Sequence, residues 1–174
     1  EGIVIDGEPT DSGDYSGPAG ARAVLRDKRV TLAVLETARG GIARRGLAVT
    51  QANVAVVTNI SADHFGEYGI DSVADLAELK LAVAHAVVER GLLVLNADED
   101  VLMAAADSLP HAANARRSLF AADADHPALV TLREQGGATC GERAGRLVLD
   151  HAGASHDLGA IDALPLTFNG AASY

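Results

Sequence analysis

Short runs of apolar residues recur along the chain, and most of them are followed directly by polar residues or glycine. The clearest runs are Ile3–Ile5, Leu32–Leu35, Val54–Thr58 and Leu92–Leu95, and Arg117–Ala121 has the apolar end of a further strand. Continuous runs of this length, rich in leucine and β-branched side chains, are typical of buried parallel strands. We therefore predict a strand at each run, within a mostly parallel sheet.

Helical spacing of apolar residues, together with capping and stop signals, predicts helices between these strands. The first expected helix begins at Pro18. Four others are expected at Ile42–Leu47, Val73–Arg90, Val101–Ala106 and Pro127–Glu134. Ser72 precedes the third of these helices, and Asp75 three residues later matches a capping box with a shorter acid. Asp98 is the expected cap of the fourth helix.

After Gly136 and Gly137 the pattern changes to short alternating runs. These runs, at Ala138–Cys140, Arg146–Leu149 and Ser155–Leu158, predict antiparallel hairpin strands. We therefore expect one α/β domain with a three-layer, mostly parallel core over residues 1–135. A small antiparallel β extension follows over residues 136–170.

Polar residues follow two of the predicted strands and suggest a site. Glu36 comes after Leu32–Leu35, whereas Asn59, Asp63 and His64 come after the run that ends at Thr58. In open α/β sheets, ligands bind outside the carboxyl ends of the strands. Carboxylate oxygen and neutral imidazole nitrogen are both ligands for divalent ions. The alternative for either position alone is ordinary turn chemistry where the sheet meets solvent.

Composition narrows the possible partners. The 174 residues carry a net charge of −10, which argues against binding to nucleic acid or to an anionic membrane. Cys140 is the only cysteine, so an internal disulfide and a multi-thiolate metal site are excluded. No apolar run approaches the roughly 18 residues of a membrane helix, and no signal-peptide pattern is visible. We therefore expect a cytoplasmic protein.

Seven motifs, in this order, resemble the central domain of the Mur ligase family, and in particular the Mur-ligase-like half of the cyanophycin synthetases. They are IVIDG at Ile3–Gly7, GDYSGP at Gly13–Pro18, LETARGGIARRGL at Leu35–Leu47, VVTNISADHFG at Val56–Gly66, ELKLAV at Glu78–Val83, VLNADED at Val94–Asp100 and LPLTFNG at Leu164–Gly170. The segments ETARGGI and TNISADHFG are the most specific.

The resemblance implies an ATP-dependent, magnesium-dependent ligase that joins a carboxylate and an amine through an acyl phosphate. In the cyanophycin synthetases, arginine is added to an aspartate side-chain carboxylate of a peptide. By this resemblance Glu36 would bind the magnesium ion on the nucleotide phosphates. His64 and Lys80 would hold a second ion, and in some family members the matching lysine is carbamylated.

The same resemblance assigns supporting roles. Asn59 and Asp63 would orient the metal ligands by hydrogen bonds. Asn96 and Asp98 would lie near the nucleotide. Arg39 is suited to phosphate or carboxylate, although a solvated surface position is an equal alternative.

The family's phosphate-binding loop, Gly-x-x-x-x-Gly-Lys-[Ser/Thr], does not occur in these 174 residues. We therefore expect the chain to be an incomplete ligase domain that is inactive alone, and we expect it to associate as a homo-oligomer. The alternative is a non-catalytic module that acts in assembly. Joint retention of Glu36, His64 and Lys80 argues against that alternative.

Overall fold

The computed structural model describes residues 2–60, 66, 68–164, 167–168 and 171–172. At the N-terminus, β1 (Ile3–Ile5) and β2 (Glu8–Asp11) form an antiparallel hairpin, followed by α1 (Pro18–Arg26) and α2 (Arg39–Arg45). Asp6 and Gly7 both have positive φ, 56° and 80°, which is the geometry of a two-residue type I′ turn. The predicted strand is confirmed, but the loop expected after it contains β2, because this turn reverses the chain at once.

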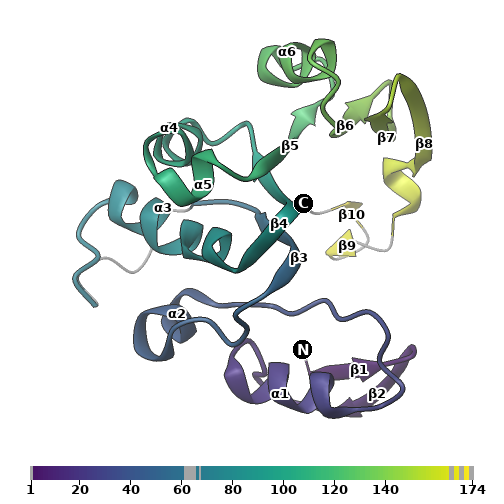
Figure 1. Cartoon of the computed structure of the whole chain (residues 1–174). Helices are drawn as coiled ribbons and strands as arrows, with labels where there is room; N and C mark the ends of the chain where they lie inside the picture. The colour runs from purple at the N-terminus through teal and green to yellow at the C-terminus, as the bar shows by residue number, and fades with distance from the viewer. Residues whose placement is uncertain (1, 61–65, 67, 165–166, 169–170, 173–174) are drawn as a thin grey trace.

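A six-stranded sheet forms the body of the molecule (Figure 1). Its strands lie side by side in chain order: β3 (Ala52–Val57), β4 (Val87–Asn96), β5 (Arg116–Asp123), β6 (Thr139–Arg143), β7 (Arg146–His151) and β8 (Ala154–Ala160). The first four strands are parallel, and β7 and β8 are antiparallel to their neighbours. The predicted α/β fold with a mostly parallel sheet is confirmed, as are the antiparallel strands after Gly137.

One hydrophobic core joins this sheet to its helices. The helices are α3 (Val73–Leu81), the 3₁₀ helix η1 (Ala82–Ala86), α4 (Asp100–Ser108), α5 (Pro110–Ala113) and α6 (Pro127–Glu134). Alternate residues of the strands, such as Leu93 and Leu95 of β4, pack against Leu76 and Leu81 of α3 and Leu102 of α4, all fully buried. The carboxyl ends of the parallel strands therefore share one edge beside the starts of α4 and α6.

A short C-terminal part follows the sheet. It consists of the 3₁₀ helix η2 (Ile161–Ala163) and a two-stranded sheet of β9 (Thr167–Phe168) and β10 (Ala171–Ala172). Among the described residues, no helix combines the length and the apolar character that a membrane span needs.

The prediction of a strand at Leu32–Leu35 is wrong. These residues have no regular secondary structure, and the side chains of Leu32 and Val34 are 80% and 90% exposed. An apolar run becomes a strand only where a neighbouring strand takes its backbone N–H and C=O groups. No described strand pairs with this segment.

The predicted helix over Val73–Arg90 is too long. The α-helix ends at Leu81, continues as η1 and gives way to β4 at Val87. Val87 pairs with Ala52 of β3, so β-branched residues that continue the helical spacing are recruited by the sheet instead. The register between β3 and β4 shifts between Ala52 and Val54. Gly91 permits this close approach of the two strands, because a Cβ there would lie 2.8 Å from the Asn53 carbonyl oxygen.

Candidate active site

Two of the predicted site residues meet just beyond the carboxyl end of β3. Ser72 is the N-cap of α3. Its hydroxyl accepts the Asp75 N–H while the Asp75 carboxylate accepts the Ser72 N–H, so the predicted capping box is confirmed. Lys80 follows in the last turn of this helix. Its Nζ donates a hydrogen bond of 2.7 Å to the backbone carbonyl oxygen of Asn59.

The next backbone group along the chain is held by a residue that the sequence analysis did not single out. Ile60 is buried, and its N–H donates to Oε1 of Glu99 at 3.2 Å. Glu99 lies just before α4, in the loop after β4. Because Glu99 and Ile60 are 39 residues apart, no local sequence signal reports this bond.

Asn96 and Asp98 organise the loop between β4 and α4. Asn96 Oδ1 accepts the Asp98 N–H at 3.0 Å, and Asp98 Oδ2 accepts the Ala122 N–H at 2.7 Å, at the end of β5. The predicted cap role of Asp98 is wrong, because α4 begins at Asp100 and Glu99 occupies the N-cap position without a side-chain cap. The Asp98 carboxylate is used instead to connect two strand ends.

Glu36 lies near the N-terminal hairpin and α1. Its exposed side chain and Leu35 line a cavity of about 340 Å³ together with Asp14, Tyr15 and Ser16. The Ala38 N–H donates to the Ser16 carbonyl oxygen at 3.0 Å, which anchors the segment there. The residues around the Asn59–Lys80 contact do not line this cavity.

Arg39 is part of a helix rather than of a strand end. It is the first residue of α2, three residues earlier than the predicted start. The reason is that the Ala38 carbonyl oxygen accepts the N–H groups of both Gly41 and Ile42, so the helical pattern begins there. Later in α2, the Arg44 guanidinium lies 5.6 Å from the centre of the Tyr68 ring, a cation–π contact.

Of the predicted metal ligands, the structure describes Glu36 and Lys80. Asp63 and His64 lie outside the described residues. Glu36 offers hard carboxylate oxygens, which suit magnesium. Lys80 as an ammonium has no lone pair and donates to Asn59 instead. Within the part of the chain that the structure describes, no three His, Cys, Asp or Glu side chains are close enough to hold one metal ion.

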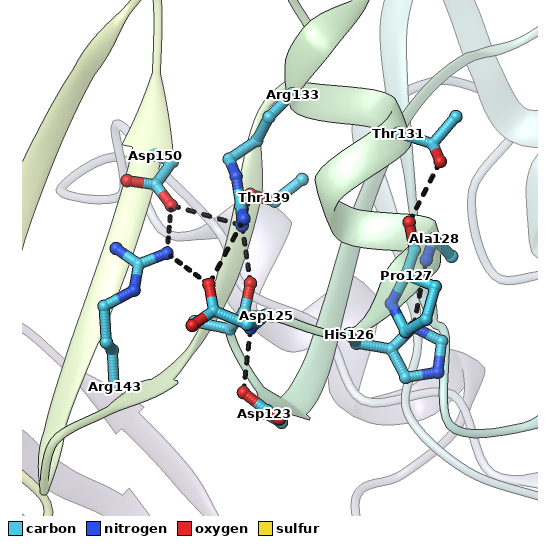
Figure 2. Close-up of polar contacts among 11 residues, drawn as sticks. Asp123, Asp125, His126, Pro127, Ala128, Thr131, Arg133, Thr139, Arg143 and Asp150 are labelled. Atoms are coloured by element: carbon cyan, nitrogen blue, oxygen red, sulfur yellow. Dashed lines mark hydrogen bonds and ion pairs between the residues drawn. The ribbon is translucent and has the colours of Figure 1, made fainter.

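A second polar cluster, absent from the sequence predictions, connects α6 to β6 and β7 (Figure 2). Oδ2 of Asp150 lies 3.4 Å from Arg133 Nη1 and 3.2 Å from Arg143 Nη2. Asp125 contacts the same two guanidinium groups at 3.5 and 3.2 Å. Arg133 also donates to the Ala124 carbonyl oxygen at 2.6 Å, so the end of α6 is attached to the sheet.

The charge of Asp150 is stabilised by this cluster. Burial acts against the ionised carboxylate, but hydrogen bonds from Ser155 and Arg143 and the positive charges of Arg143 and Arg133 outweigh it. They hold the pKa of Asp150 below its ordinary value of 3.8. Beside the cluster is a cavity of about 330 Å³, whose lining includes Arg133, Arg143 and Asp150.

Comparison with known proteins gives a consistent family. The Mur ligase middle domain matches residues 7–138. The whole chain is 37% identical to the cyanophycin synthetase of Trichormus variabilis and 36% identical to that of Nostoc sp.. A further cyanophycin synthetase, from Synechocystis sp., is 40% identical over 74% of the chain.

These relatives are much longer than the chain. The 174 residues span 19% of the Trichormus and Nostoc proteins, and the matched part covers 14% of the Synechocystis protein. The middle-domain match covers most of the chain, and it agrees with the α/β sheet. The chain therefore belongs to the Mur ligase family.

Proposed function

We propose that the chain is part of an ATP-dependent ligase that forms an amide bond between a carboxylate and an amine. The observation that carries this proposal is the contact between Lys80 and Asn59 at the carboxyl end of β3, in a chain of the Mur ligase family. Similarity to three cyanophycin synthetases supports a related substrate pair. We propose arginine as the amine and an aspartate side chain of a peptide as the carboxylate.

The proposed reaction has two transfers. An oxygen of the substrate carboxylate attacks the γ-phosphorus of ATP, the bond to ADP breaks, and an acyl phosphate forms. The amine nitrogen then attacks the acyl carbon, inorganic phosphate leaves with the electron pair of the broken C–O bond, and the amine loses a proton. Both steps gather negative charge on phosphate oxygens, so a suitable site needs fixed cationic groups there.

Lys80 is suited to this task in its unmodified form. An ammonium has three N–H donors, and one of them is used on the Asn59 carbonyl oxygen. Among the described residues no second acceptor holds this ammonium, and we propose that its other donors act on phosphate or carboxylate oxygens of the substrates. We propose that the contact with Asn59 holds the ammonium in place while the other two donors act on substrate oxygens. Lys80 would have to be carbamylated to bind a metal ion together with His64.

The remaining residues have proposed roles that follow from their chemistry. Glu36 would hold magnesium, which would supply Lewis-acid charge stabilisation at the nucleotide phosphates. Asn96 and Asp98 would lie near the nucleotide, and Arg39 would face an anionic group. Asp63 would orient His64, as a hydrogen-bonded carboxylate orients a ligating imidazole.

The test uses the full-length natural protein, with release of ADP and formation of the amide as readouts. Wild-type protein, ATP, magnesium, arginine and an aspartate peptide should produce ADP and amide in equal amounts. Lys80→Gln should lower the rate by about 100-fold or more, the scale of removing one fixed electrostatic group. Lys28 is the only other lysine and is exposed after α1, so Lys28→Gln is the matched control and should retain the wild-type rate.

Two results would overturn the proposal. One is the absence of ATP-dependent amide formation by the wild-type protein, which would favour a non-catalytic module. The other is a Lys80→Gln protein that works at the rate of Lys28→Gln.

A further inference from the structure

A single peptide unit beyond β3 is held on both sides by side chains of opposite charge. The carbonyl oxygen of Asn59 accepts from the Lys80 ammonium at 2.7 Å, and the N–H of Ile60 donates to the Glu99 carboxylate at 3.2 Å. These two groups belong to the same planar peptide bond. We call this arrangement, Lys80 to the Asn59–Ile60 peptide to Glu99, the peptide clamp.

The two bonds of the peptide clamp reinforce each other. Both involve an ionised partner, and such hydrogen bonds are stronger than neutral ones. An amide whose N–H donates to a carboxylate has a more negative carbonyl oxygen, because hydrogen bonds in a chain polarise one another. The Glu99 carboxylate therefore makes the Asn59 oxygen a better acceptor for Lys80 by acting through the peptide that they share.

Among the described residues, the Glu99 carboxylate has no other hydrogen-bond partner than the Ile60 N–H. Glu99 occupies the N-cap position of α4, yet its side chain does not cap that helix. Its neighbours Asn96 and Asp98 take backbone N–H groups elsewhere in the loop and in β5. The half-buried side chain of Glu99 instead reaches across to the segment after β3.

We propose that Glu99 is a positioning residue that holds Lys80 in place through the Asn59–Ile60 peptide. This role rests on the proposed function, in which the Lys80 ammonium acts on substrate oxygens. Without Glu99 the peptide loses one of its two restraints, so both the Asn59 carbonyl oxygen and the ammonium bound to it gain freedom to move. A displacement of about 1 Å in a reacting group can cost about 100-fold in rate.

The kinetic test compares Glu99→Ala, Glu99→Gln and a control in the full-length natural protein. Glu99→Ala should lower kcat by about tenfold or more, with KM for ATP within about twofold, because alignment rather than binding is lost. Glu99→Gln keeps an oxygen that can accept the Ile60 N–H and should restore most of kcat. The control is Glu142→Ala, which removes a carboxylate that accepts the Gly145 N–H in the β6–β7 turn, and it should keep the wild-type kcat.

A double variant separates action through Lys80 from an independent effect. In a Lys80→Gln background, Glu99→Ala should change kcat by less than about twofold, because the group it positions is already gone. Losses that multiply in the double variant would overturn the proposal. So would a wild-type kcat for Glu99→Ala, or an equal loss for Glu142→Ala.

Amide hydrogen exchange, read by mass spectrometry on peptides that end at Ile60, tests the clamp without catalysis. The Ile60 amide should exchange faster in Glu99→Ala than in wild-type protein or Glu142→Ala. If wild-type protein makes no amide, the proposed function fails, and this exchange result alone decides whether the peptide clamp exists. Unchanged exchange at Ile60 in Glu99→Ala would overturn the clamp itself.

Discussion

Replacing Asp150 with alanine tests the polar cluster that attaches α6 to the sheet. Asp150→Ala removes an acidic partner that Arg133 and Arg143 share, because their guanidinium groups lie 3.4 and 3.2 Å from Oδ2. The side chains of Asp150 and Arg133 are only 14% and 21% exposed. The variant therefore leaves positive charge in a partly desolvated place, with Asp125 as the acid that remains.

The expected loss lies between two limits. Exposed ion pairs contribute about 0–1 kcal/mol, and removing one partner of a fully buried pair costs about 3–5 kcal/mol. Because Asp150 is mostly buried but Asp125 still neutralises the arginines, we expect Asp150→Ala to lower the free energy of unfolding by about 2 kcal/mol. For 174 residues this corresponds to a decrease in Tm of roughly 4–8 °C.

The assay is urea and thermal denaturation of the 174-residue chain at constant ionic strength. Asp157→Ala is the matched control, because Asp157 pairs with Arg146 at 2.6 Å on the same β-hairpin but both side chains are about half exposed. The control should lose clearly less stability than Asp150→Ala. Equal losses in the two variants would refute the argument from burial.

The pH dependence of Asp150→Ala has a definite sign. The pKa of Asp150 is lowered in the folded protein, so its charge stabilises the fold above its ordinary pKa of 3.8. That contribution is lost as the pH falls through the lowered pKa. The stability difference between wild-type protein and Asp150→Ala should therefore be constant at pH 5–7 and shrink below the ordinary pKa. A difference that grows as the pH falls would contradict the assignment.

Three further predictions concern the ligase site and the open edge of the sheet. In the full-length protein, Glu36→Ala should abolish amide formation without unfolding, with a barrier increase of at least about 2.7–4 kcal/mol; normal turnover would remove Glu36 from the mechanism. The 174-residue chain should self-associate, because β3 is an edge strand of the described sheet with Val54 and Val56 about half exposed; light scattering that shows only monomer at high concentration would refute this. Magnesium–ATP should raise the Tm of the chain by about 1 °C or less. A competent site, with ligand at a hundred times its Kd, would add about 2.7 kcal/mol to the free energy of unfolding and raise the Tm by roughly 5–10 °C. A saturable rise of several degrees would show that nucleotide binding needs no glycine-rich loop.

Local signals in the sequence determined much of the secondary structure. The capping box of Ser72 and Asp75 starts α3, and helix α6 has the predicted bounds Pro127–Glu134. The strands around Val54–Thr58, Leu92–Leu95 and Arg117–Ala121 all formed. In each case the deciding interactions are within a few residues, or the apolar run is long enough to require burial.

Sheet pairing decided where local signals failed. Leu32–Leu35 has the apolar character of a strand, but no described strand supplies partners for its backbone groups. Val87 and Val88 continue the helical spacing of α3, yet they join β4 because the sheet offers pairing beside Ala52. The family motifs could be recognised from the sequence alone, because each of them is a short contiguous stretch of residues.

The connections around the site were decided by tertiary structure alone. Asp98 was an obvious helix cap in the sequence, but its carboxylate instead accepts a hydrogen bond of 2.7 Å from the N–H of Ala122 in the adjacent strand. Glu99 had no distinguishing local pattern, and only the fold brings its carboxylate to the Ile60 N–H, 39 residues away. The sequence by itself thus determined which residue types follow each strand. Tertiary structure determined which backbone group each of them binds, because a hydrogen bond requires donor and acceptor to be close together, and only the fold brings distant segments within that distance.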